Sequence, residues 1–252
     1  MTVKVLHMYP NMLDLYGDSG NMELLSYRLK MRGHGFEKTS YTIGDGAKTD
    51  FESYDLIYLG GGADFEQQLL AEDLLSCKDK ILRAYKSGVF MLMICGGYQL
   101  MGKYYKDSNG KKIPGLGLFD YYTVASTNKR ERCIGNIVIE TDIGGKKYKV
   151  IGFENHGGMT ENVKTPFGKV IFGNGNKFGS ETEGYREKNV IATYLHGPLL
   201  SKNPKLADHI LEYVLSRKQG SPVSLKPLND ELESKAREVM FKRLLESGKN
   251  KK

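Results

Sequence analysis

A buried strand that ends in a cysteine and two glycines constrains the fold of this chain more than any other feature. Residues 89–94 read Val-Phe-Met-Leu-Met-Ile, a continuous apolar run, and Cys95-Gly96-Gly97 follow directly. A run without polar alternation suits a strand that is buried on both faces, as in a parallel sheet. Helix-forming residues come next, so the sequence predicts a strand-to-helix elbow of the kind that lifts a nucleophile above a sheet edge.

Strands and helices alternate through the rest of the first half. Strands are predicted at 3–8, 36–43 and 55–59, helices at 65–75 and 80–86, and a helix that Ser19 can cap runs to Gly33. The second half has strands at 136–140, 148–153, 169–172 and 190–195, a Gly144-Gly145 turn, and helices at 204–215 and 229–246. These elements predict an α/β protein with a mostly parallel central sheet, flanking helices and antiparallel strands in the second half.

Cys95 is the cysteine that its context singles out as a nucleophile. Glycines at 96 and 97 permit a strained turn and a close approach of substrate, and a helix N-terminus stabilises a thiolate. Cys77 and Cys133 lack such an elbow and are predicted to be buried packing residues. Three cysteines without paired spacing favour a reducing compartment over a disulfide scaffold or a zinc ribbon.

A nucleophilic cysteine needs a base. His196 follows the apolar run 190–195 and is therefore expected at a strand end, where ligand sites of α/β sheets gather. His156, in a glycine-rich loop, is a second candidate. The remaining histidines are predicted to pack or to face solvent: His7, His34 and His209.

Acyl transfer also needs donors for an oxyanion. Gly60-Gly61-Gly62 directly follow a strand, at the sheet edge where the elbow is expected. The backbone N–H groups of Gly61, or of a neighbour, and of Gly96 are therefore the predicted oxyanion donors.

A Gly-Gly-Gly loop, a Cys-x-Gly-x-Gln elbow and a strand-end histidine, in this order, resemble the class I glutamine amidotransferases of the CobB/CobQ type. The segments 11–21, 152–158 and 193–198 also look like this family. The resemblance implies that Cys95 and His196 are catalytic and that Gly60 and Gln99 contact the substrate. The common form continues His-x-Glu, whereas Gly197-Pro198 follow here, so the third catalytic member stays open.

The resemblance also implies an arginine that binds glutamine, shortly before the predicted strand at 136–140. Counting back from Gly135 favours Arg132, whereas counting on from Thr127 favours Lys129 or Arg130. Arginine suits this role because its planar fork forms two parallel hydrogen bonds to a carboxylate.

The resemblance covers roughly residues 3–245. It implies a CobB/CobQ-type glutamine amidotransferase domain at 3–203, a helical extension at 204–246 and a basic tail at 247–252. The expected reaction is hydrolysis of L-glutamine, with ammonia delivered in a heterodimer to a MurT-like Mur-ligase subunit that amidates the D-glutamate of lipid II in peptidoglycan synthesis. No G-x-x-x-x-G-K-[ST] loop occurs, so no cofactor is expected in this chain, and ATP and Mg are expected in the partner.

Charge and hydropathy bear on partners and location. The net charge is +7, but the acidic and basic residues of 235–252 sum to +5, so a solvated last helix and tail explain most of it and no nucleic acid is expected. No apolar run long enough to span a bilayer occurs, and the N-terminus lacks a signal-peptide layout, so the chain is expected to be cytoplasmic and to act at the inner face of the membrane.

Two other functions fit the same residues. One is a free-standing γ-glutamyl hydrolase with the same nucleophile and no ammonia transfer. The other is a non-catalytic α/β binding module with a redox-active cysteine.

Overall fold

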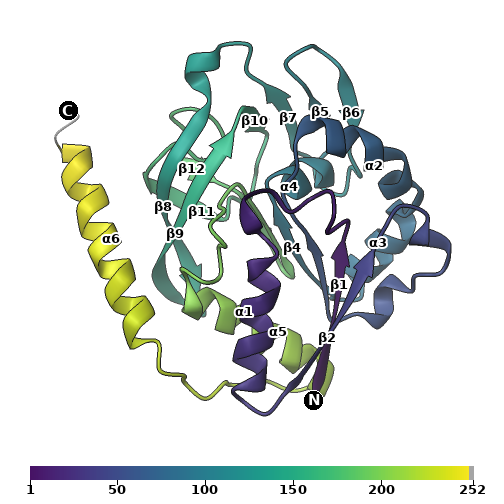
Figure 1. Cartoon of the computed structure of the whole chain (residues 1–252), viewed down its shortest axis with the longest axis vertical. Coiled ribbons are helices and arrows are strands. Elements are labelled where there is room, and N and C mark those ends of the chain that lie inside the picture. The colour runs from purple at the N-terminus through teal and green to yellow at the C-terminus, as the bar shows by residue number, and fades with distance from the viewer. Residues whose placement is uncertain (250–252) are drawn as a thin grey trace.

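The buried strand predicted before Cys95 lies in the middle of a six-stranded sheet, in the order β13-β14-β4-β3-β1-β2 (Figure 1). The structure is a computed structural model that describes residues 1–249, and of residues 247–249 only the backbone. Residues 250–252 of the tail predicted at 247–252 therefore lie outside the described residues. The helical extension and the other predicted domain boundaries stay predictions.

Five strands of this sheet run parallel. Parallel strands that follow one another in the chain need crossover connections, and helices supply them between β1 and β2 and between β3 and β4. Every residue of β4 is buried, which explains its unbroken apolar sequence. The carboxyl ends of the parallel strands therefore meet at one edge. The strands of the sheet are β1 (Thr2–Met8), β2 (Gly35–Tyr41), β3 (Leu56–Leu59), β4 (Phe90–Ile94), β14 (Val190–Thr193) and the antiparallel edge strand β13 (Tyr185–Glu187).

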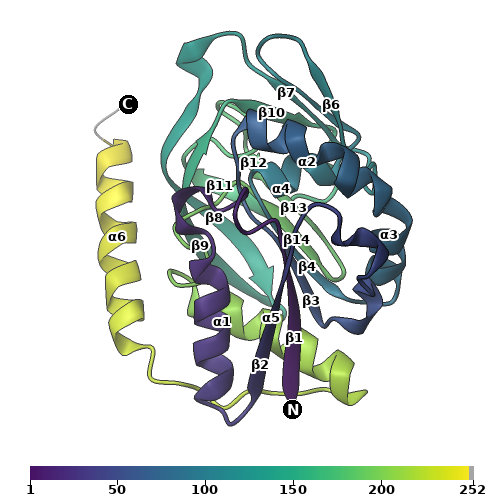
Figure 2. The same cartoon turned by 45° about the vertical axis from the view of Figure 1, so that its right-hand side comes forward.

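Helices cover both faces of this sheet (Figure 2). α1 (Gly20–Lys30) and α5 (Pro204–Gln219) contact each other on one face, and α2 (Asp64–Ser76) and α3 (Lys78–Lys86) lie on the other. This division follows from right-handed crossovers, since the β1–β2 and β3–β4 connections run in opposite directions across the sheet. Short 3-10 helices occur at Leu15–Gly17, Asp45–Ala47, Phe51–Ser53 and Lys129–Glu131.

The predicted capping role of Ser19 is wrong. Ser19 does occupy the position before α1, but its side chain makes no capping hydrogen bond. Its own backbone is already helical, with φ −56° and ψ −24°, whereas a capping residue is usually extended. Its N–H instead donates to Asp14 Oδ1 at 2.6 Å, which ties the helix start to the preceding loop.

The second half adds two four-stranded sheets, in the orders β10-β7-β5-β6 and β12-β11-β8-β9. The long hairpin of β8 (Cys133–Ile143) and β9 (Lys146–His156) turns at Gly144-Gly145, both with positive φ, as the sequence predicts. The remaining strands are β5 (Tyr104–Lys106), β6 (Lys112–Pro114), β7 (Tyr122–Ala125), β10 (Gly158–Glu161), β11 (Gly168–Phe172) and β12 (Thr182–Glu183).

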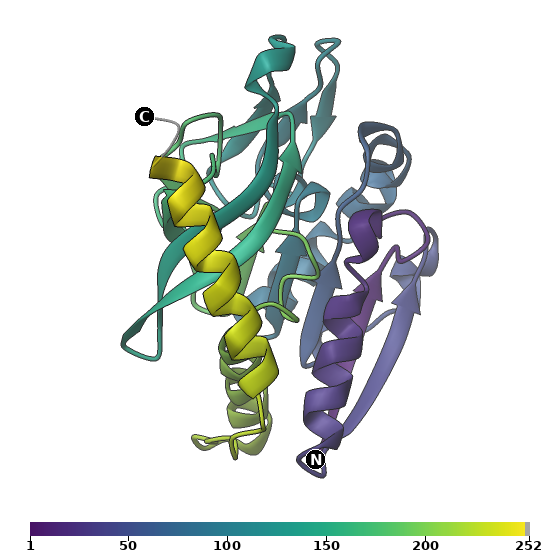
Figure 3. The same cartoon turned by 60° about the vertical axis from the view of Figure 1, so that its left-hand side comes forward.

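The last helix, α6 (Glu231–Lys249), lies along the β8–β9 side of the molecule (Figure 3). Two cation–π contacts join it to β9. Lys149 Nζ of β9 lies 4.1 Å from the ring centroid of Phe241 in α6, and the guanidinium of Arg237 in α6 lies 4.4 Å from the ring centroid of Tyr148 in β9. Within residues 1–249, no helix has both the length and the apolar character needed to cross a membrane.

Candidate active site

Cys95 sits at the junction of β4 and α4 (Gly96–Met101), as the elbow pattern predicts. Its φ of 50° and ψ of −100° are values that a residue with a side chain rarely adopts. The surrounding hydrogen bonds hold this conformation: Cys95 N–H donates to Thr193 O at 2.8 Å, and Gln99 N–H donates to Cys95 O at 3.0 Å. The result is a thiol that is 8% exposed and lines a cavity.

His196 follows β14 and is fully buried. Its backbone exchanges two hydrogen bonds with Phe153 of β9, at 2.8 and 3.0 Å, which fixes the residue between the central sheet and the hairpin. Its Nδ1 donates to Asp18 Oδ2 at 2.7 Å. The imidazole is therefore oriented from both its backbone and its side chain, with Nε2 left free of protein hydrogen bonds among the described residues.

Asp18 is the acid of this arrangement, and the sequence prediction missed it. It lies just before α1, 178 positions from His196, and its carboxylate is fully buried. The only signal was its place in the family-like segment 11–21, because no spacing rule connects an N-terminal loop to a late strand. The question of a third member, left open by the missing acid after His196, thus has a candidate within this chain.

The charges around His196 favour its protonated form. Burial lowers the pKa of His196, but the negative charge of Cys95 and the hydrogen bond to Asp18 outweigh it and raise the pKa to about 10. Burial also raises the pKa of Asp18, which the hydrogen bond and charge of His196 oppose. An imidazole that holds a proton therefore lies beside Asp18 and Cys95, as a cysteine nucleophile with a base and an orienting acid requires.

Tyr16 covers the histidine from the other side. Its ring packs edge-on against His196 with centroids 4.9 Å apart, and its hydroxyl accepts a hydrogen bond from Asn155 Nδ2 at 2.6 Å. The φ of Tyr16 is 64°, so the loop adopts an unfavourable conformation to place this ring.

The Gly60–Gly62 loop packs against the elbow, and each position is too close to a neighbour for a side chain. A Cβ at Gly61 would lie 2.8 Å from His196 Cε1 and 3.2 Å from Cys95 Cβ, which places this residue at the reacting groups. A Cβ at Gly96 would lie 3.1 Å from Gly62 N, so the two glycine segments face each other. Gly60 is not among the cavity-lining residues; its carbonyl accepts from Gly97 N–H at 3.1 Å.

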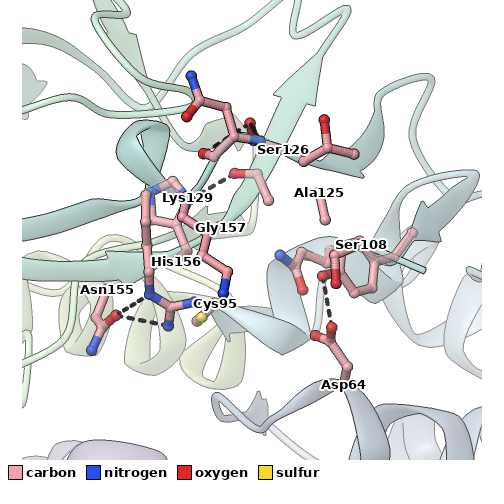
Figure 4. A pocket seen from close by; sticks show the side chains of 15 residues that line it. Asp64, Cys95, Ser108, Ala125, Ser126, Lys129, Asn155, His156 and Gly157 are labelled. Carbon is pink, nitrogen blue, oxygen red and sulfur yellow. Dashed lines mark hydrogen bonds between the residues drawn. The ribbon is translucent and has the colours of Figure 1, made fainter. Parts of the chain in front are cut away.

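Cys95 opens into a cavity of about 570 Å³, a volume typical of small-molecule sites (Figure 4). Gln99 lines it, but its amide is already used: Nε2 donates to Tyr194 OH at 3.3 Å, and Oε1 accepts from Gln67 at 3.0 Å. His156 also lines it, with Nδ1 2.7 Å from Gly158 O and its ring stacked on Tyr194. Burial lowers the pKa of His156 to about 4, so this second candidate base is a neutral wall residue.

Of the three basic candidates for glutamine binding, the structure brings two to the cavity. Arg132 and Lys129 line it, whereas Arg130 does not. Arg132 donates Nε and Nη2 to Asn155 Oδ1, at 3.1 and 2.9 Å, and these bonds are drawn in Figure 4. Arg132 and Lys129 therefore both lie where a glutamine could be bound, and the choice between them stays a prediction.

Comparison with known proteins shows to which family this chain belongs. The profile of the CobB/CobQ-like glutamine amidotransferase domain matches residues 4–204. The chain belongs to this family. A curated relative from Staphylococcus aureus (strain N315), the GatD subunit of lipid II isoglutaminyl synthase (glutamine-hydrolyzing), is 38% identical over 239 residues, 95% of each chain.

The subunit of the same name from Streptococcus pneumoniae (strain ATCC BAA-255 / R6) is also 38% identical, over 90% of this chain and 86% of that protein. A crystal structure described as a glutamine amidotransferase aligns with a TM-score of 0.54 at 16% identity, over 83% of this chain and 98% of the other. This third similarity supports the α/β fold alone.

In this glutamine amidotransferase the other two cysteines are packing residues, as predicted. Cys77 and Cys133 are each 1% exposed, and burial raises the pKa of Cys133 to about 12. A thiol that stays protonated is a poor nucleophile. Of the three cysteines, Cys95 alone lines the cavity.

Proposed function

We propose that this glutamine amidotransferase hydrolyses L-glutamine at Cys95 and passes the ammonia to a separate ATP-dependent ligase subunit. One observation carries the proposal: Asp18 and His196 come from distant segments to lie buried behind Cys95, which lines the same cavity as Arg132. This is the arrangement of a thiol, a base and an orienting acid that acyl transfer requires.

Cys95 attacks the side-chain amide carbon of glutamine as a thiolate. Asp18 accepts a hydrogen bond from the Nδ1–H group of His196, and the proton stays on the ring. This bond holds the imidazole with Nε2 toward the reacting groups. His196 then donates its Nε2 proton to the leaving nitrogen, ammonia departs, and a γ-glutamyl thioester remains. Water, deprotonated by His196, attacks the thioester and releases glutamate and the Cys95 thiolate.

The oxyanion of each tetrahedral intermediate lies between the two glycine segments. Gly96 N–H, at the start of α4, is one donor, and the Gly61–Gly62 backbone supplies the other. Each such donor contributes on the order of 3 kcal/mol to transition-state stabilisation. Side chains are excluded here by the close packing, which leaves room for backbone donors only.

The names of two relatives support the choice of ammonia acceptor. Both curated relatives are named as subunits of a glutamine-hydrolysing lipid II isoglutaminyl synthase. On this ground the partner is a MurT-like Mur-ligase subunit that uses ATP and Mg to activate the α-carboxyl of D-glutamate in the lipid II stem peptide. The heterodimer works in the cytoplasm at the inner face of the membrane, where its lipid-linked substrate is held.

Ammonia release from L-glutamine, with and without the co-purified ligase, tests this function. The wild-type chain should release ammonia, the complex should release it faster, and Cys95→Ala should abolish release in both. Ammonia release by Cys95→Ala would overturn the assignment of the nucleophile. Hydrolysis that no ligase accelerates would favour a free-standing γ-glutamyl hydrolase.

A further inference from the structure

The Cys95 cavity has charges of both signs at its wall without an ion pair between them. Arg132 and Lys129 lie there, and neither has a carboxylate within 4.0 Å in the described part of the chain. Among the described residues that line this cavity, Asp64 is the sole carboxylate. The hollow thus presents an unpaired anion and unpaired cations to whatever enters it.

Asp64 is placed to meet a cation. It begins α2, directly after the glycine loop, and accepts a hydrogen bond from the Tyr105 hydroxyl on Oδ2 at 3.1 Å. Burial raises the pKa of Asp64, and the charge of Asp107 raises it further, whereas the Tyr105 hydrogen bond and the charge of Arg132 lower it. A half-buried carboxylate with one neutral donor is stabilised when a cation arrives.

The other polar groups of the cavity wall do not compete for this role. The amide of Gln99 is hydrogen-bonded to Gln67 and Tyr194, and His156 is neutral, with a buried Nε2 that has no partner among the described residues. Neither offers the negative charge that would balance an ammonium group.

We infer that Asp64 binds the α-ammonium group of the substrate while Arg132 binds its α-carboxylate, so the cavity selects a free amino-acid end. The inference rests on the proposed function, because attack by Cys95 fixes the position of the side-chain amide. The α-carbon then lies three bonds further into the cavity. Asp64 and Arg132 line the same cavity as Cys95, so one ligand that fills this cavity meets both charges. Figure 4 shows Asp64 and Asn155, to which Arg132 is hydrogen-bonded, on either side of Cys95.

The inference is tested by binding to Cys95→Ala, in which no turnover occurs, with L-glutamine and with 4-carbamoylbutanoate, which lacks the α-ammonium group. Titration calorimetry should show that loss of this group weakens binding by ~10- to 100-fold, the value of a charged hydrogen bond. In Cys95→Ala/Asp64→Asn the two ligands should bind with nearly equal affinity, because only glutamine loses a contact.

The second ligand is also the folding control, since its affinity should be the same in both proteins. Asp120→Asn, which removes a surface carboxylate paired with Lys103, should leave the discrimination between the ligands unchanged. Equal discrimination with and without Asp64, or none in the parent, would overturn the inference. Ammonia release by the wild-type chain is measured separately, so failure here is distinguishable from failure of the glutaminase function.

Discussion

At the scale of single residues, His196 depends on one hydrogen bond from a segment that is remote in sequence. The bond to Asp18 fixes which ring nitrogen carries the proton, and its negative charge opposes the effect of burial on the pKa of His196. Both effects act on the step in which ammonia leaves.

Asp18→Asn should therefore reduce kcat by about 10²- to 10⁴-fold, because the asparagine amide donates to Nδ1 and favours the wrong tautomer. The pKa of His196 should fall, so the basic limb of the pH–rate profile, where His196 loses the Nε2 proton that it donates to ammonia, should shift to lower pH. Asp14→Asn is the matched control, since Asp14 caps the same loop through Ser19 N–H and is not hydrogen-bonded to His196. If Asp18→Asn retained the wild-type kcat, Asp18 would not be the acid that orients His196, and the partner subunit would be the next place to test for it.

Glu183 links stability to pH. It is fully buried and accepts from Thr193 Oγ1 at 2.9 Å and Tyr194 N at 2.7 Å, and burial raises its pKa to about 8. An unfolded glutamate titrates near 4.5, so between these values the folded state holds the extra proton. Stability should thus fall as pH rises through this window.

Glu183→Gln, which is neutral throughout, should remove this slope. Urea unfolding between pH 5 and 8 should show a wild-type decline steeper than that of the variant by at most ~1.4 kcal/mol per pH unit. Glu140→Gln, at a surface pair with Lys147, should retain the wild-type decline. Parallel curves for wild type and Glu183→Gln would mean that Glu183 is ionised when folded.

At the scale of elements, the sequence predicted the parts of the site that a local pattern encodes. The β4–α4 elbow and the β14 end could be read from an apolar run and the residues after it, and the structure confirms where both lie. The α1 cap and the acid could not, because each depends on how the loop at 11–19 folds back against β14. A glycine count indicates close packing, but only the structure shows which atom each glycine meets.

Gly97 shows what the elbow requires. A Cβ at this position would lie 2.5 Å from Leu59 O, a backbone atom of β3 that cannot move aside. Gly97→Ala should therefore lower the free energy of unfolding by ~1–3 kcal/mol, measured by urea denaturation. Gly157→Ala is the control, since its nearest neighbour would be Arg132 Nη1 at 3.6 Å, and equal loss in both would refute a steric cause.

At the scale of the whole molecule, α6 is set apart from the chemistry. It lies along the β8–β9 hairpin, and none of its residues as far as Glu246 lines the Cys95 cavity. Asp230 lies just before α6, and its Oδ1 forms an ion pair with Arg28 Nη1 at 2.7 Å. This pair joins the segment before α6 to α1.

A chain that ends at Asp230 should therefore keep the kcat and KM of the isolated protein for glutamine. It should lose no more than ~2 kcal/mol of stability, because most of α6 faces solvent. Ammonia assays and urea unfolding on the truncated chain measure both quantities, with a chain that ends at Glu246 as the reference. A large rise in KM would show instead that α6 supports the cavity.

The distance along the chain between Asp18 and His196 also has a consequence for synthesis on the ribosome. The thiol is synthesised well before its base, which must then join a loop that was synthesised earlier than either. An incomplete chain therefore carries Cys95 without the means to activate it. Glutamine hydrolysis therefore requires the central sheet to be assembled as far as β14, so enzymatic activity reports that this sheet has formed.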